Sequence, residues 1–183
     1  MENTGEHLVG QYLQEIKNCD FVQYNLQTKF TQGEIDVVAI NSNKKEIFIC
    51  EVATHLETGL QYNKNGKTDN VNRFVSKFTK NIKYSKKNFS NYNCHFMLWT
   101  PIIKIPKKED SKINQLNDLH LIKHKIESKF NIEIELIYNK KYLDCINELR
   151  NVAKNTSSAM TSSLMRFLQI EEKLKSHIEK TTE

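Results

Sequence analysis

The chain has 183 residues, of which 38% are hydrophobic and 27% are charged, and its formal net charge at pH 7 is +5. This length is typical of one ordinary domain, and the composition is typical of a globular protein. No stretch approaches the roughly 18 consecutive apolar residues of a membrane span, and the N-terminus lacks the pattern of a signal peptide. The four cysteines form no C-x-x-C pair, which argues against a zinc ribbon or a disulfide framework. We therefore expect a cytoplasmic globular domain without membrane contact.

Hydrophobic spacing predicts alternating helices and strands along the chain. Helices are expected over residues 4–18, 70–87, 112–129, 141–154 and 157–180. Strands are expected over residues 21–30, 34–40, 46–54, 95–103 and 132–138. This alternation predicts an α/β or α+β domain with a mixed sheet and additional C-terminal helices. Because no linker interrupts it, we assign residues 1–155 to one domain and residues 156–183 to a C-terminal helix.

The C-terminal helix carries a heptad-like seam that is interrupted by Glu171. The seam consists of Met160, Leu164, Phe167, Leu174 and Ile178. It can pack on its own domain, or it can contact a second copy of the chain or a partner protein. The helix is terminal and otherwise polar, which favours a homodimer or a partner contact.

Positive charge is concentrated between residues 63 and 87, where eight basic residues accompany one acid, Asp69. Such a segment can neutralise the phosphates of a nucleic acid, although a solvated lysine-rich helix face has the same composition. The helix expected over residues 70–87 places Phe74, Phe78 and Ile82 on one side and its basic residues opposite. The candidate nucleic-acid contacts are Lys64, Lys67, Arg73, Lys77 and Lys80.

Two acidic residues stand within the apolar strands expected over residues 34–40 and 46–54. Because side chains alternate along a strand, Asp36 shares a face with Val38, and Glu51 shares a face with Ile49. The five-residue turn between the strands is compatible with a hairpin, so the two carboxylates can converge. A buried carboxylate is costly unless it is satisfied, and a divalent cation satisfies it well. The alternative is an exposed Asp36 with Glu51 paired to a nearby lysine.

The order of these features resembles the PD-(D/E)XK nuclease family, particularly its restriction-endonuclease-like and resolvase-like members. The residues that carry the resemblance are Glu6 on the first helix, the run GEID ending at Asp36, and Glu51-Val52-Ala53. The similarity covers residues 4–105 and implies a core of the order α-β-β-β-α-β. It also implies hydrolysis of phosphodiester bonds with Mg²⁺, for which Mn²⁺ can substitute.

The resemblance assigns roles to individual residues. Asp36 and Glu51 match the acids that bind the metal, and the backbone carbonyl of Val52 would be a third metal contact. Glu6 matches an acid that assists through a water molecule, and Glu34 is a weaker candidate for the same neighbourhood. Glu6 can also form a capping box with Asn3 at the start of its helix.

The sequence departs from the family at position 53, where Ala53 stands in place of the motif lysine. Some members take a basic or amide residue from the following helix instead. The candidates here are Lys64, Lys67, Arg73 and Lys77, and we name Lys77 as the catalytic lysine. Its place opposite the apolar face equally suits a plain surface lysine. Gln32 and His55 flank the motif strands and are further candidates.

The sequence as a whole predicts a metal-dependent endonuclease that acts on nucleic acid, DNA rather than RNA. Defence against foreign DNA, repair and junction resolution are all compatible contexts, and we favour defence. The alternative is a nuclease-like fold that has lost catalysis with its lysine and serves as a nucleic-acid-binding or assembly subunit. The two hypotheses differ in whether the purified protein cuts DNA.

Overall fold

The computed structural model describes residues 3–28, 33–106 and 114–181, which form an α+β domain with five helices and a mixed five-stranded sheet. The helices are α1 (Thr4–Glu15), α2 (Asn70–Asn88), α3 (Gln115–Phe130), α4 (Asn139–Asn155) and α5 (Ser163–Thr181). The strands of the main sheet are β1 (Phe21–Gln27), β2 (Glu34–Asn41), β3 (Glu46–Val52), β6 (Asn93–Thr100) and β7 (Ile134–Tyr138). Two short strands, β4 (Asn63–Lys64) and β5 (Lys67–Thr68), form a separate hairpin. Within these ranges, no helix is long and apolar enough to cross a membrane.

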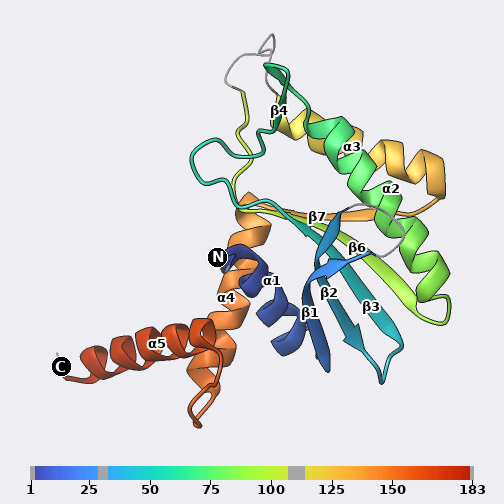
Figure 1. Cartoon of the computed structure of the whole chain (residues 1–183). Helices are drawn as coiled ribbons and strands as arrows, with labels where there is room; N and C mark the ends of the chain where they lie inside the picture. The colour runs from blue at the N-terminus through green and yellow to red at the C-terminus, as the bar shows by residue number, and fades with distance from the viewer. Residues whose placement is uncertain (1–2, 29–32, 107–113, 182–183) are drawn as a thin grey trace.

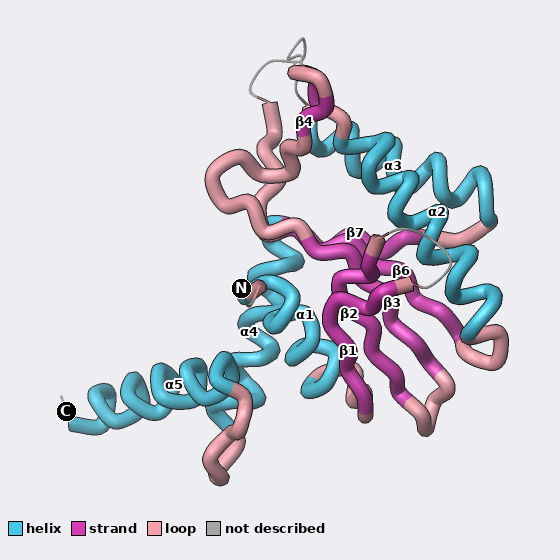
Figure 2. The backbone as a smooth tube through the Cα atoms, viewed as in Figure 1, coloured by secondary structure: helices cyan, strands magenta, loops and turns pink. Residues whose placement is uncertain are grey.

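The strands of the main sheet lie side by side (Figure 2) in the order β1-β2-β3-β6-β7. The sheet combines an antiparallel half with a parallel half. The first three strands form an antiparallel meander, whereas β6 runs parallel to β3, and β7 runs parallel to β6. Parallel neighbours need crossover connections, and the helices α2 and α3 provide them. The carboxyl end of β3 therefore leads through the β4–β5 hairpin directly into α2.

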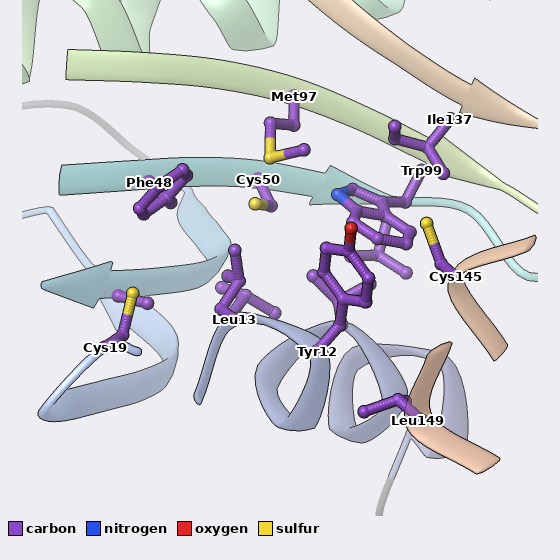
Figure 3. Close-up of a cluster of buried hydrophobic side chains, with 14 of the residues drawn as sticks. Tyr12, Leu13, Cys19, Phe48, Cys50, Met97, Trp99, Ile137, Cys145 and Leu149 are labelled. Atoms are coloured by element: carbon purple, nitrogen blue, oxygen red, sulfur yellow. The ribbon is translucent and has the colours of Figure 1, made fainter. Parts of the chain in front are cut away.

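Helices cover both faces of the sheet and bury two hydrophobic clusters (Figure 1). On one face, α1 and α4 pack over Trp99, whose ring lies edge-on to Tyr12 and Tyr142 at centroid distances of 5.2 and 5.8 Å (Figure 3). On the other face, α2 and α3 bury a cluster that contains Phe74, Phe78, Ile47, Ile49 and Ile134. The two clusters hold the sheet between helical layers, and Trp99 is a core residue.

The predicted elements correspond to the observed ones, with three corrections. The strand expected over residues 95–103 begins at Asn93 and ends at Thr100, directly before Pro101. The last helix begins at Ser163 instead of residue 157. In the segment before it, the Gln169 side chain accepts from the Met160 N–H and donates to the backbone oxygens of Thr156 and Ser158. The β4–β5 hairpin was not predicted. The expected strand end at Phe30, the helix start at Lys112 and the candidate Gln32 lie outside the described residues.

The C-terminal seam divides between two environments. Met160 precedes α5 and packs against the cluster that contains Trp99, as do Met165 and Leu168 on the inner face of α5. By contrast, large apolar side chains on the opposite face of α5 are exposed, and we call them the outer stripe. The outer stripe consists of Phe167, Ile170, Leu174 and Ile178. The helix extends away from the sheet toward the C-terminus (Figure 1), and only part of the predicted seam is exposed.

Candidate active site

Asp36 and Glu51 lie side by side at one end of the β2–β3 ladder, and we call them the carboxylate pair. The ladder ends with Val37 opposite Cys50, and the next residues along the two strands are Asp36 and Glu51. Directly opposite Cβ atoms are about 5 Å apart. Asp36 is 6% exposed and Glu51 is fully buried. The interpretation of Asp36 as an exposed edge residue is therefore wrong.

Lys77 of α2 reaches this pair. Its Nζ lies 3.2 Å from Oδ1 of Asp36 and also donates a hydrogen bond to Oε2 of Glu51. Burial opposes the charge of Lys77, but Glu51 and Asp36 outweigh it, so the pKa of Lys77 is raised. The ammonium group thus offsets the repulsion between two acids that face each other across neighbouring strands.

The prediction that Lys77 lies opposite the apolar face of its helix is wrong. It lies three residues after Phe74 and four before Asn81, and both of these side chains are buried. The buried face of α2 includes polar residues, Asn70, Asn81 and Ser85. A helical wheel that counts only apolar residues omits these three positions. It therefore places the centre of the buried face too far from Lys77.

Asn81 completes the support of Glu51 and was not singled out from the sequence. Its Nδ2 donates a 2.6 Å hydrogen bond to Oε1 of Glu51, while Lys77 donates to the other carboxylate oxygen. Its own Oδ1 is buried without a hydrogen-bond partner among the described residues. The spacing of four residues from Lys77 is the signal that places Asn81 on the same helix face.

Burial raises the pKa of Glu51 to about 8, and the neighbouring Asp36 adds to the increase, whereas Lys77 and Asn81 oppose it. A carboxyl group with such a pKa holds its proton over part of the neutral range. A cation bound beside this carboxyl group would favour its ionised form and so lower its pKa. The pair is therefore arranged as an anionic site that favours a positively charged partner.

Glu6 comes to the same site from α1. It is 7% exposed, and burial raises its pKa, with a further contribution from Asp36. Asn3 caps α1 by accepting a hydrogen bond from the Gly5 backbone N–H, and its side-chain amide also donates to Glu6. The capping role and the position near Asp36 therefore coexist. Glu34 is exposed and accepts a hydrogen bond from Gln27, so it lies at the rim of the site.

The close approach of α1 depends on Gly5. A Cβ atom at this position would lie 2.0 Å from Cγ2 of Thr54, which is the second residue after the end of β3. Only glycine allows this helix turn to contact the end of the strand that carries Glu51. The contact fixes the distance between Glu6 and the carboxylate pair.

Ala53 and His55 are two further positions considered from the sequence. Ala53 is 2% exposed and belongs to the hydrophobic cluster under α2 and α3. His55 packs edge-on against the ring of Tyr62 at a centroid distance of 5.0 Å, and no hydrogen bond to the carboxylate pair is observed for it in the described structure. The lysine of the site therefore comes from α2, at position 77.

A cleft of about 920 Å³ opens beside Lys77, and we call it the basic cleft. It lies between the start of β2, the β4–β5 hairpin and α2, and Lys64, Arg73, Lys77 and Lys80 line it. The guanidinium of Arg73 stacks over the ring of Tyr62 at 4.2 Å, and Lys80 donates to the backbone oxygen of Glu34. Lys67 is exposed on β5 and lies outside the lining. Four of the five predicted nucleic-acid contacts thus surround one cleft.

The oxygen atoms of Asp36, Glu51 and Val52 are of the kind that bind a hard cation, although they do not form a cluster of three side-chain ligands. The described residues contain no group of three or more His, Cys, Asp or Glu side chains positioned to hold a metal ion. Asp36 and Glu51 supply two carboxylates, and the Val52 N–H donates a 2.7 Å hydrogen bond to Asp36. Because the N–H and C=O of a strand residue point to the same edge, the Val52 carbonyl lies on that side as well. Two carboxylates and a carbonyl oxygen fit Mg²⁺, which retains several waters.

Comparisons with protein-family models, with curated proteins and with solved structures find no match to this chain. The functional interpretation therefore depends on the geometry of the site.

Proposed function

We propose that the protein is a Mg²⁺-dependent DNA endonuclease with a restriction-endonuclease-like core. The observation that carries the proposal is the position of the Lys77 ammonium on both Asp36 and Glu51, beside a cleft lined with basic side chains. Two acids and a lysine at the edge of a basic cleft are the groups that phosphodiester hydrolysis needs. Defence against foreign DNA is the biological role that we propose for this activity.

The order of the elements supports the proposed core. Counting α1, β1, β2, β3, α2 and β6 in sequence gives α-β-β-β-α-β, with the small β4–β5 hairpin inserted before α2. The acids stand on the second and third strands of this series, and the lysine stands on the helix that follows. Ala53 is uncharged, so it cannot act as the motif lysine. Lys77 instead brings an ammonium group to the same pair of acids.

The side chains of the site have separate tasks in this proposal. Mg²⁺, when bound by Asp36, Glu51 and the Val52 carbonyl, would supply Lewis acidity at the phosphate. Lys77 would then release its contacts with the acids and stabilise the negative charge that develops on the phosphate under attack. Asn81 orients Glu51 through its 2.6 Å hydrogen bond, and Glu6 orients a water molecule near Asp36.

The inactive-subunit alternative is motivated by Ala53 and by the heptad-like C-terminal helix. It predicts salt-sensitive binding of DNA without cleavage under any metal. The ion pairs of Lys77 with Asp36 and Glu51 favour the active nuclease over this alternative, because they bring an ammonium group to the acids despite Ala53.

The proposal is tested by incubating purified protein with supercoiled, linear, single-stranded and branched DNA, in Mg²⁺, in Mn²⁺ and in a chelator. We expect metal-dependent cutting that Asp36→Ala abolishes while circular dichroism and the melting temperature show an intact fold. Lys83→Ala, which removes an exposed lysine from the same helix, is the matched control and should cut normally. Salt-sensitive binding without cutting on every substrate would support the inactive subunit instead.

We also propose that the outer stripe of α5 pairs with α5 of a second copy. Phe167 and Leu174 occupy successive a positions of a heptad, Ile170 occupies a d position, and each is more than half exposed. Within the described structure, Arg166 donates to Gln169, and Glu171 pairs with Arg150 and Lys175. The proposed contact between copies is therefore apolar.

A further inference from the structure

The β4–β5 hairpin projects polar side chains at the edge of the basic cleft. Its two strands pair Asn63 with Thr68 and Lys64 with Lys67. The turn between them is Asn65-Gly66, with φ values of 51° and 74°, which are the left-handed values that a tight two-residue hairpin turn requires. All six residues from 63 to 68 are exposed, and none is apolar. The hairpin therefore contributes nothing to the hydrophobic core.

The base of the hairpin is nevertheless held firmly. Asn70, which is 1% exposed, accepts a 2.8 Å hydrogen bond from the Tyr62 N–H and donates to the Leu60 oxygen and to Asp118. The Asp69 N–H donates a 2.7 Å hydrogen bond to the Tyr62 oxygen and closes the base. A two-stranded hairpin is marginal by itself, so these bonds keep its exposed tip in a defined place.

The cross-strand pair of Lys64 and Lys67 points to an anionic ligand. Like charges directly opposite each other on two strands destabilise a hairpin. Within the part of the chain that the structure describes, neither lysine forms an ion pair. Lys64 and Asn63 line the basic cleft together with Lys77, so the hairpin and the lysine that contacts the carboxylate pair border the same cleft.

We propose that the β4–β5 hairpin enters the major groove of duplex DNA and reads bases next to the cleavage site. This inference rests on the proposed function, and it names the substrate of that site as a duplex. The major groove is about 12 Å wide and admits a two-stranded ribbon. Lysine pairs with the O6 and N7 of guanine, and asparagine pairs with the N6 and N7 of adenine, so the tip suits a purine-containing site.

Base reading explains the composition of the tip better than phosphate binding alone. The basic residues of α2 already supply positive charge to the cleft. Asn63 carries no charge and lies outside the turn, and its side chain presents an amide donor and acceptor. A ribbon that alternates lysine and asparagine on a rigid base is therefore suited to contacting base edges.

The test is a selection of bound sequences from a randomised duplex pool, which does not require cleavage. Wild-type protein is compared with the Lys64→Thr/Lys67→Thr variant, in which two β-forming residues keep the strand pairing and the Asn65-Gly66 turn is unchanged. The control variant, Lys83→Ala/Lys125→Ala, removes two exposed lysines elsewhere, so the net charge is equal.

We expect wild-type protein and the control to enrich the same purine-containing motif, and the hairpin variant to enrich none. Affinity of the hairpin variant for the selected duplex should fall about 10- to 100-fold, since one good base contact contributes about 1–3 kcal/mol. The inference is overturned if the hairpin variant enriches the wild-type motif, if wild-type protein enriches none, or if it prefers single strands. A wild-type protein that enriches a motif without cutting would refute the proposed function and leave this inference standing.

Discussion

At the scale of single residues, the site balances two buried carboxyl groups against the partly exposed ammonium group of Lys77. Asp36 and Glu51 repel each other across the β2–β3 ladder, and Lys77 and Asn81 hold the resulting charge in place. Removal of Lys77 would leave the charges of the two acids uncompensated, whereas protonation of one acid relieves the repulsion between them. The protonation of Glu51 therefore links the site to the stability of the whole domain.

The stability of the chelated protein should depend on pH through Glu51. Its pKa is about 8 in the folded protein against 4.5 for an unperturbed carboxyl, so the folded state binds more protons between these values. The free energy of unfolding should accordingly decrease as the pH rises through this interval. Urea denaturation in EDTA from pH 5 to pH 9 measures the decrease, and Glu51→Gln should flatten it. An equal slope in the variant would show that another group is responsible.

At the scale of elements, the packing of α1 against the end of β3 positions Glu6. The two strands that carry the acids can be predicted from the sequence, because apolar residues mark β2 and β3. Asp36 and Glu51 stand out as charged residues within these apolar runs. The orientation of α2 cannot be predicted from apolar residues, since Asn70, Asn81 and Ser85 occupy its buried face. The β4–β5 hairpin has a clear signal in Asn65-Gly66, but its strands are too short and too polar to show a period.

Gly5→Ala tests the position of α1. The added Cβ would overlap with Cγ2 of Thr54, so we expect a loss of about 1–3 kcal/mol in stability and a reduced cleavage rate. Thr54→Ser removes the overlapping methyl group and keeps the hydroxyl that lies near Asn3. The double variant should recover most of both losses in thermal unfolding and in cleavage assays. A double variant no better than Gly5→Ala would mean that the contact does not set the geometry.

At the scale of the whole molecule, the two faces of α5 have different partners. The inner face is fixed to α4 through Leu168 and through the ion pair between Arg150 and Glu171. The outer stripe has an apolar surface whose partner would come from a second copy. A dimer would bring two carboxylate pairs into one particle, which suits an enzyme that cuts both strands of a duplex.

Leu174→Glu should convert the dimer to a monomer, because it buries two like charges at the centre of the proposed helix pair. Sedimentation velocity at several protein concentrations measures the change. Leu121→Glu alters an exposed leucine on α3 and is the matched control, which should remain dimeric. A wild-type protein that sediments as a monomer at every concentration would contradict the proposed pairing.

The most direct test of the account is the single-turnover rate of DNA cleavage by Lys77→Ala in Mg²⁺, compared with wild type and Lys83→Ala. If Lys77 replaces the missing motif lysine at position 53, its removal should lower the rate about 100- to 1000-fold, as expected for loss of a group that stabilises transition-state charge. Lys83→Ala should cut at the wild-type rate, and circular dichroism should show that all three proteins are folded. Equal rates for wild type and a folded Lys77→Ala would contradict the catalytic role of Lys77.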